Sequence, residues 1–250
     1  MGQECYQPVA QRFGRVRHMT SLLIAASVEC ELELLRTKLQ TRSAGMIGGF
    51  SYSVAQVENR RLFLATTGVG IVSAGVAFGA LLPTLAVDRA VIIGSAGALP
   101  GSGLDNGDVV VASSETLAEL GTCDSEGIGD CSSLNLPGLQ QSILLDDDLA
   151  RSLLDAARGP FRARRGACLS VAGASGDLIQ AEARAKRFGA LAENMEGYSL
   201  ALAGSRFGIK VGELRAISNQ AGVRDKSAWD LDAANERVQT VILRYLERGD

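Results

Sequence analysis

Short apolar runs alternate with segments of helical spacing along almost the whole chain, and this alternation constrains the fold more than any other feature. Thr20–Ala26 is typical of a buried strand, and leucines recur at helical spacing in Glu29–Gln40. At the other end, Lys210–Ser218 predicts an apolar strand and Leu231–Glu247 an amphipathic helix. Such alternation predicts a three-layer α/β/α sandwich with a mixed, twisted central sheet.

The segments in between follow the same pattern. Strands are expected at Ser51–Val57, Arg61–Thr66, Arg89–Gly94, Gly107–Ser114, Arg164–Ala172 and Leu191–Met195. Helices are expected at Gly70–Val87, Asp147–Ala157, Gln180–Phe188 and Gly197–Phe207. The polar, glycine-containing stretch Thr116–Leu145 interrupts the alternation and predicts a surface insertion, which is a candidate lid over a site.

The length favours a single domain. A chain of 250 residues suits one large α/β domain, and we expect residues 19–250 to form it. Residues 1–18 contain three arginines and no apolar run of the signal-peptide type, so we expect a disordered extension with Met19 as the native start. The one histidine, His18, falls in this extension, which disfavours histidine-based catalytic schemes.

The net charge and the cysteine content limit which classes of ligand and which cellular location are expected. A formal net charge of −3 gives no general attraction to nucleic acid or to anionic membranes, so a small-molecule ligand is expected. The five cysteines are odd in number and scattered, which indicates neither a disulfide framework nor a zinc site and favours a cytoplasmic location. No apolar run is long enough to span a membrane, and neither a metal nor a cofactor is expected.

Glycines and glutamates gather at the expected carboxyl ends of strands, where ligands bind in open α/β sheets. The glycines of Thr67–Gly70, Gly94–Gly97 and Gly173–Gly176 allow backbone to approach a ligand, but none of these segments has the Walker A or GxGxxG pattern. A Rossmann-type oxidoreductase is therefore disfavoured. Glu29 suits the amino terminus of a helix, whereas the spacing of Glu31 allows it to turn inward. Glu193 and Glu196 follow the run that ends at Ala192.

Six short motifs together resemble the nucleoside phosphorylase and nucleosidase family, from about Leu22 to nearly the carboxyl end. In chain order they are Ala26–Glu31, Thr67–Gly70, Gly94–Leu99, Gly107–Val111, Asn194–Gly197 and Arg215–Asn219. Each motif alone is weak evidence for the family, but six motifs in the family's order are not expected by chance. The resemblance implies the fold of the nucleoside phosphorylases and cleavage of an N-glycosidic bond.

The resemblance also implies roles for individual residues. Glu31 matches the water-activating glutamate of methylthioadenosine nucleosidases, while Met195 matches the residue beside the sugar and Glu196 the one on its hydroxyls. The loops near the water and the ribose then include Gly70, Ser95, Ala96 and Gly97. Arg215 is expected in a buried structural ion pair rather than in catalysis.

Two departures from the family pattern indicate the reaction and the base. Family phosphorylases carry a phosphate-binding arginine where this chain has Ile92, which favours hydrolysis, although Arg224 is an alternative phosphate ligand. Adenine-releasing nucleosidases use an aspartate where this chain has Asn219. An amide can donate to a purine 6-oxo oxygen and accept from a protonated N7, so hypoxanthine or guanine is expected, with Ser218 and Gly176 also at the base.

Within the family, Ser218–Asn219 and the downstream run Arg224–Trp229 resemble the branch that hydrolyses futalosine in the alternative menaquinone pathway. Futalosine is an inosine-type nucleoside whose 5′ extension carries an aryl carboxylate. Candidate residues for that extension are Arg224, Lys226 and Trp229, although a charged loop with one packed tryptophan is an equal alternative. Because related nucleosidases complete their 5′ pockets across a subunit interface, the resemblance also implies a homodimer or higher homo-oligomer.

Other functions stay open at this point. The same fold is found in nucleosidases that act on methylthioadenosine, S-adenosylhomocysteine or inosine, and in purine phosphorylases. Asn219 argues against the adenine-releasing nucleosidases, and Ile92 argues against the phosphorylases. A nucleoside-binding protein that has lost catalysis is the alternative of another class, because fold likeness alone does not give an activity. Retention of both Glu31 and Glu196 argues against it.

Overall fold

The structure is a computed structural model that describes residues 20–124, 127–128 and 131–248, so the expected extension 1–18 lies outside the described residues. The strands are β1 Thr20–Ala26, β2 Arg42–Ile47, β3 Phe50–Val57, β4 Arg60–Thr66, β5 Arg89–Ala98, β6 Val109–Leu117, β7 Cys123–Asp124, β8 Gly127–Ile128, β9 Ser142–Leu144, β10 Ala163–Ser170, β11 Ala192–Asn194 and β12 Lys210–Gln220. The helices are α1 Glu33–Lys38, α2 Ile71–Leu85, α3 Asp147–Ala157, α4 Leu178–Phe188, α5 Gly197–Phe207 and α6 Leu231–Glu247, with short 3₁₀ helices η1 Glu29–Glu31, η2 Cys131–Leu134 and η3 Lys226–Ala228.

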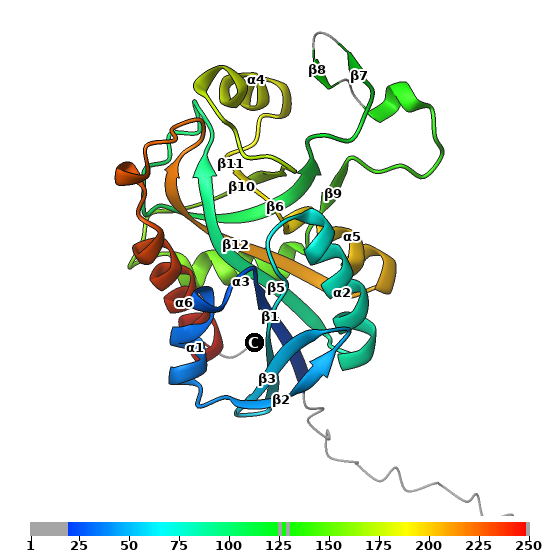
Figure 1. The fold of residues 1–250 in the computed structure, drawn as a ribbon. Coiled ribbons are helices and arrows are strands. Elements are labelled where there is room, and N and C mark those ends of the chain that lie inside the picture. The colour runs from blue at the N-terminus through cyan, green and yellow to red at the C-terminus, as the bar shows by residue number, and fades with distance from the viewer. Residues whose placement is uncertain (1–19, 125–126, 129–130, 249–250) are drawn as a thin grey trace, which may run out of the picture.

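Ten strands form one mixed sheet in the order β11-β10-β6-β12-β5-β1-β4-β3-β2, with β9 paired to β6 (Figure 1). Strands β1, β4, β5 and β12 run parallel to their neighbours in the centre, whereas β12 pairs antiparallel with β6 and β3 pairs antiparallel with both β2 and β4. Strand β11 also pairs with β5, which brings the two halves of the sheet together around β12. The expected mixed sheet is confirmed.

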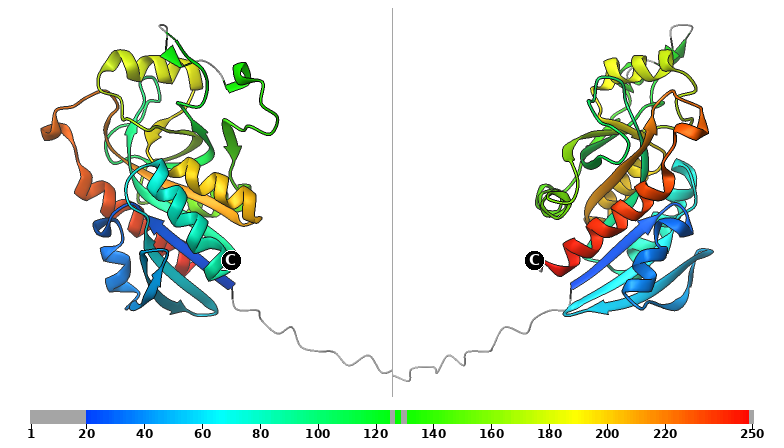
Figure 2. Two further views of the ribbon diagram at one scale, coloured as in Figure 1. Left: turned by 45° about the vertical axis from the view of Figure 1, so that its right-hand side comes forward. Right: turned by 90° about the vertical axis from the view of Figure 1, so that its left-hand side faces the viewer.

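Helices cover both faces of the sheet, as the alternation of apolar residues requires (Figure 2). Leu23 and Ile92 pack toward α2 and α5 in one buried cluster. Ile24 and Val91, one residue along each strand, pack toward α1, α3 and α6 in a second cluster. Side chains of successive strand residues point to opposite faces, so β1 and β5 contribute to both cores. The three-layer sandwich expected from the sequence is therefore confirmed.

The structure differs from the predicted elements in three places. The helix expected at Glu29–Gln40 is divided into η1 and α1, because the chain turns at Leu32. Strand β2 was not predicted, since five of its six residues are exposed and give no apolar alternation. The insertion Thr116–Leu145 is not wholly irregular, because β9 returns to pair with β6 while the small β7–β8 hairpin stands apart from the sandwich (Figure 1).

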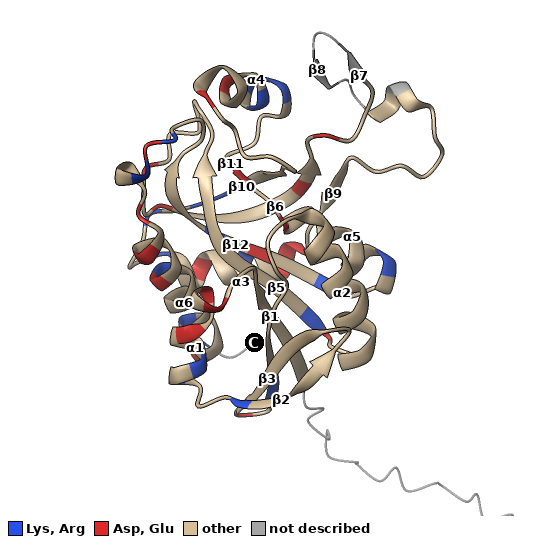
Figure 3. Cartoon of the chain, in the orientation of Figure 1, with Lys and Arg blue, Asp and Glu red and all other residues tan. Residues whose placement is uncertain are grey.

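Charged residues of both signs are interspersed over most helices, but α2 carries none (Figure 3). No helix in the described part of the chain is long and apolar enough to cross a membrane.

Candidate active site

A pocket of about 340 Å³ opens where several strands end. Ser27 and Val28 follow β1, Val171 follows β10, and Met195 follows β11. Residues of β5 and β12 supply further parts of the wall. The volume lies within the range of small-molecule sites, and the position is the one expected for a ligand in an open α/β sheet.

The pocket brings together most of the residues predicted from the sequence. Those in its wall are Glu31, Ser95, Ala96, Gly97, Met195, Glu196, Ser218, Asn219, Arg224 and Trp229. Three predicted residues are not among the described residues of the wall: Gly70, Gly176 and Lys226. No described residue of the insertion Thr116–Leu145 belongs to the wall either, so the structure gives the lid hypothesis no contact with the pocket.

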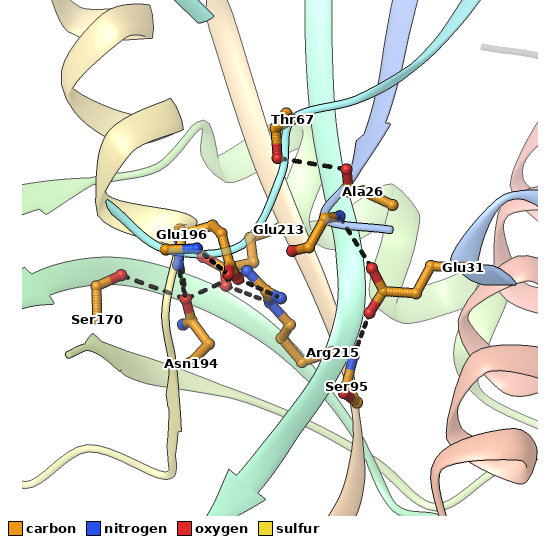
Figure 4. A network of polar contacts seen from close by, with 12 residues as sticks. Ala26, Glu31, Thr67, Ser95, Ser170, Asn194, Glu196, Glu213 and Arg215 are labelled. Carbon is orange, nitrogen blue, oxygen red and sulfur yellow. Dashed lines mark hydrogen bonds and ion pairs between the residues drawn. The ribbon is translucent and has the colours of Figure 1, made fainter. Parts of the chain in front are cut away.

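Glu31 is turned inward by η1, immediately after β1 (Figure 4). Its Oε2 accepts hydrogen bonds from the backbone N–H groups of Ser27 at 2.9 Å and Val28 at 3.2 Å, and its Oε1 accepts from Ser95 N–H at 3.3 Å. Burial raises the pKa of this carboxyl, while the charge of Arg215 and the backbone donors oppose the rise. The neighbouring Glu29 is exposed and pairs with Arg36, as expected for a structural residue.

Glu196 faces the pocket at the start of α5. Its Oε1 accepts from the backbone N–H of Gly70 at 2.9 Å, and its Oε2 lies 3.4 Å from Arg215 Nη1. Gly70 has a φ of 95°, a left-handed conformation that glycine adopts without strain, so its amide is free to point at the carboxylate. Gly70 therefore acts on Glu196 from outside the pocket wall. Asn194 Oδ1 accepts from Glu196 N–H at 2.9 Å and Gly197 N–H at 2.8 Å, which fixes the turn into α5.

Arg215 on β12 connects the acidic residues and is 1% exposed (Figure 4). Its Nε donates to Glu213 Oε1 at 2.7 Å, and its Nη2 donates to Asn194 Oδ1 at 3.2 Å. A Cβ atom at Gly94 would lie 2.8 Å from both Arg215 Nη1 and Glu31 Oε1, so only glycine leaves room for these two groups to meet there. The surrounding carboxylates raise the pKa of Arg215, which stays charged. The expected buried ion pair is present.

Asn219 follows a bulge in β12, where the register with β5 shifts between Ile217 and Asn219. Its Oδ1 lies 2.9 Å from Ser218 Oγ, and its Nδ2 donates to the carbonyl of Gln220 at 3.0 Å. An amide has two N–H groups and two carbonyl lone pairs, so one of each stays available to a ligand. The bulge and the serine together orient the amide in the pocket wall.

Arg224 and Trp229 form one rim of the pocket. The Arg224 guanidinium carbon lies 4.9 Å from the centre of the Trp229 ring, and Trp229 Nε1 donates to Val223 O at 3.0 Å. Lys226 lies in η3 and lines a separate surface depression. That depression has only Trp229 and Leu231 in common with the pocket. Of the three candidates for a 5′ group, the structure thus brings two to the site.

The loop after β10 is held by an ionic network that the sequence did not reveal. Ser175 N–H donates to Glu193 Oε1 at 2.8 Å, and Arg184 of α4 donates to Glu193 Oε2 at 3.1 Å and to Glu119 Oε1 at 2.7 Å. Ser175 lines the pocket, whereas the adjacent Gly176 donates to Gln180 at the start of α4 and turns away. Glu193, like Glu196, comes shortly after Ala192 in the chain. Both of its carboxylate oxygens are engaged in these contacts, so its role is structural.

Comparison with known proteins settles the family. The family model described as the phosphorylase superfamily matches residues 21–247. The chain belongs to the phosphorylase superfamily. A futalosine hydrolase of Thermus thermophilus is 36% identical over 193 residues, which cover 72% of this chain and 79% of the relative. A 5′-methylthioadenosine/S-adenosylhomocysteine nucleosidase of Halalkalibacterium halodurans is 26% identical and covers 92% and 99% of the two chains.

Solved structures of superfamily members share the fold. The 5′-methylthioadenosine/S-adenosylhomocysteine nucleosidase of Neisseria meningitidis, in complex with methylthio-immucillin-A, superposes with a TM-score of 0.81 at 23% identity, covering 92% of this chain and 99% of the other. The native futalosine hydrolase of Helicobacter pylori gives the same TM-score at 18% identity, covering 92% and 98%. The family and the class of enzyme expected from the sequence, a nucleoside hydrolase, are confirmed.

Proposed function

We propose that this phosphorylase-superfamily chain hydrolyses the N-glycosidic bond of a 6-oxopurine nucleoside, with futalosine as the substrate. The observation that carries the proposal is the arrangement of two buried carboxylates, Glu31 and Glu196, facing one pocket on either side of Arg215. The similarity to the Thermus thermophilus futalosine hydrolase supports the choice of substrate. The products are hypoxanthine and dehypoxanthine futalosine, a step of the alternative menaquinone pathway in the cytoplasm.

The two carboxylates suit the charge that develops during the reaction. As the purine leaves the ribosyl carbon, the sugar becomes an oxocarbenium-like cation. Glu31 takes a proton from the attacking water, whose oxygen forms the new bond to C1′ while the bonding electron pair departs with the base. Glu196 accepts hydrogen bonds from the ribose hydroxyls as the charge grows. The backbone donors of Gly70 and Ser95 hold both carboxylates before the substrate binds.

Water rather than phosphate is the proposed attacking group. Ile92, at the position of the family's phosphate-binding arginine, is fully buried in the core against α2 and α5. An aliphatic side chain offers no donor to a phosphate oxygen. Arg224 lies at the rim of the pocket, stacked on Trp229, whereas Arg215, which contacts Glu196, is surrounded by carboxylates that would repel an anion.

Asn219 is proposed to select the base. The departing base takes a proton from solvent water at N7, and Asn219 donates its second N–H to the 6-oxo oxygen while its Oδ1 accepts from the N7–H. We expect Asn219→Asp to shift the ratio of kcat/KM for adenosine-type over inosine-type nucleosides upward by about tenfold, because a mismatched buried polar group costs about 1–3 kcal/mol. Parallel kinetics with methylthioadenosine and futalosine measure the ratio. An unchanged ratio in a folded variant would refute the role of Asn219.

Arg224 and Trp229 are proposed to bind the aryl carboxylate of the 5′ extension. Arg224→Met keeps an apolar stem against the tryptophan but removes the charge. We expect the KM for futalosine to rise by about tenfold or more, since a hydrogen bond to a charged group contributes about 1.5–3 kcal/mol, while the KM for inosine changes little. Lys226→Met is the matched control, with no change expected for either substrate. Equal effects of Arg224→Met on both substrates would contradict the assignment.

A homo-oligomer is proposed to form over α2. Val69 lines the pocket, and Val72 and Val76 follow at helical spacing with exposed fractions of 81% and 59% on a helix without charged residues. Exposed apolar stripes of this kind mark association surfaces. We expect light scattering to give at least twice the chain mass for the native protein and a lower mass for Val72→Asp. A monomeric native protein would overturn this proposal.

The function itself is tested by the base released from a panel of nucleosides. Purified protein is incubated with futalosine, inosine and methylthioadenosine in phosphate-free buffer, and the bases are separated by chromatography. The proposal predicts hypoxanthine from futalosine, with little release from the other two. Adenine release would favour the methylthioadenosine nucleosidase alternative, and binding without release would favour a nucleoside-binding protein.

A further inference from the structure

Two buried carboxyl groups that the proposed reaction does not use lie beneath the ribose-binding residues. Glu115 of β6 is 0% exposed and Glu213 of β12 is 1% exposed. Neither belongs to the pocket wall as described. Both face the start of α5, because a Cβ atom at Gly197 would collide with Glu115 Oε1 and with both carboxylate oxygens of Glu213. Such burial is costly for two charges of the same sign.

The hydrogen bonds around the two carboxyl groups leave room for one hydrogen between them. Glu115 Oε2 accepts from Ser170 Oγ at 2.7 Å, and Glu115 Oε1 accepts from Asn194 Nδ2 at 2.6 Å. Glu213 Oε1 accepts from Arg215 Nε at 2.7 Å. Glu213 Oε2 is buried, and no N–H or O–H donor of the described residues reaches it. Since Oε2 and Glu115 Oε1 crowd the same point beside Gly197, a carboxylic acid at Glu115 supplies the missing donor.

We infer that Glu115 and Glu213 share one proton, held on Glu115 Oε1 and donated to Glu213 Oε2, and that this pair positions Asn194 and Arg215 for ribose binding by Glu196. The kinetic part of the inference rests on the proposed function. The proton itself does not, because it follows from the packing of the two carboxyl groups.

The charges around the pair support a single shared proton. Among the residues that the structure describes, Arg215 is the one cation paired with it, and the same guanidinium also faces Glu196 and Glu31. The other neighbours are Ser170, Asn194 and the thiol of Cys168, whose pKa is raised by burial and by the nearby carboxyls, so it adds no charge. Burial and the adjacent Glu213 raise the pKa of Glu115 well above its usual range. Two ionised carboxylates in contact would therefore be strongly repelled.

The pair reaches the pocket through two residues. Asn194 donates to Glu115 with Nδ2, and with Oδ1 it accepts the backbone N–H groups that set the position of Glu196. Arg215 donates to Glu213 with Nε and faces Glu196 with Nη1. Loss of the shared proton would separate the two carboxylates and displace both links. Glu115 and Glu213 are thus positioning residues, acting on Glu196 rather than on the substrate.

Glu213→Gln is the decisive variant, because an amide N–H takes the place of the proton shared by the two carboxyl groups. The new Nε2 donates to an ionised Glu115, and Oε1 continues to accept from Arg215, so net charge and hydrogen bonds are unchanged while one proton is lost. We expect KM and kcat within about threefold of the wild type. Glu213→Ala leaves Glu115 without its partner, and we expect KM to rise by about tenfold or more. Glu115→Gln is the matched control and is also impaired, because both contacts are made at Oε1, where an amide nitrogen donates to Glu213 but cannot accept from Asn194 Nδ2.

Two measurements detect the proton without any substrate. In infrared spectra taken in D₂O near neutral pH, the wild type minus Glu213→Gln difference should contain the C=O band of a protonated carboxyl. The free energy of unfolding should fall more steeply with rising pH in the wild type, because above the usual pKa of a glutamate only the folded state holds the extra proton. An absent band, parallel pH profiles, or a Glu213→Gln variant as impaired as Glu213→Ala would overturn the inference. An inactive wild type that keeps the band would instead overturn the proposed function alone.

Discussion

Replacing Glu31 with glutamine should lower kcat for futalosine by a factor of about 10²–10⁴, the usual contribution of a general base. The amide keeps the two hydrogen bonds from Ser27 and Val28 but can no longer take a proton from water. Binding of a ground-state ligand should change by less than about threefold, because the lost interaction develops in the transition state. Steady-state kinetics and titration with a non-hydrolysable nucleoside separate the two effects.

Glu29→Gln is the matched control for this experiment. Glu29 lies on the same 3₁₀ turn but is exposed and paired with Arg36, so its turnover should equal that of the wild type. Equal losses in the two variants would indicate a disturbed turn rather than a missing base. A Glu31→Gln variant with wild-type turnover would remove Glu31 from the reaction.

The same residue gives the expected pH profile. Glu31 acts in its ionised form, so activity is lost as pH falls through its pKa. Because burial raises that pKa, the acid limb of kcat/KM should lie above the usual value for a glutamate, about 4.3. Arg215 stays charged across this range and adds no limb of its own. The acid limb should disappear in the residual activity of Glu31→Gln.

Replacing Arg215 with leucine should destabilise the fold by about 3–5 kcal/mol, the cost of leaving buried charges without their partner. Arg215 contacts Glu213 and Glu196 and faces Glu31, and all three carboxyls are almost fully buried. Part of the loss will be offset at Glu31, whose pKa is raised by burial and held down by the charge of Arg215, so the variant should recover stability as pH is lowered. Urea unfolding at several pH values measures the free energy of unfolding and its slope.

Arg151→Leu is the control for the loss of an arginine. Arg151 forms ion pairs with Asp147 and Asp148 on the exposed side of α3, where such pairs contribute little. Its effect on stability should stay within about 0.5 kcal/mol. If Arg215→Leu were equally mild, the buried network would not have the energetic role described for it.

Apolar periodicity predicted the layers and most elements, because the cores against α2 and α6 are built from alternating strand residues such as Leu23 and Ile24. Strand β2 carries no such pattern, because it lies at the edge of the sheet with most of its residues exposed. It is held there by backbone hydrogen bonds to β3. Strand β9 is too short to signal itself. Backbone pairing with a partner strand thus supplied what periodicity could not.

In the site, too, local motifs predicted some residues, whereas contacts between elements determined others. The family motifs predicted that Glu31 and Glu196 would share a pocket, while the glycine-rich segment Gly173–Gly176 and the run Arg224–Trp229 suggested Gly176 and Lys226 as further members. Gly176 instead precedes Asp177, the amino-terminal cap of α4, and Lys226 belongs to the 3₁₀ turn η3, beside a separate surface depression. The pairings of Glu115 with Glu213 and of Arg184 with Glu193 depend on which strands and helices become neighbours, which no local pattern records.

The sugar product of futalosine cleavage shows whether water or phosphate attacks the ribosyl carbon. Wild-type protein is given futalosine with and without inorganic phosphate, and the base and sugar are identified by mass spectrometry. We predict hypoxanthine and a free, unphosphorylated sugar, formed at the same rate in both buffers. A sugar 1-phosphate formed only when phosphate is present, or a failure to release hypoxanthine at all, would contradict hydrolysis by water activated at Glu31.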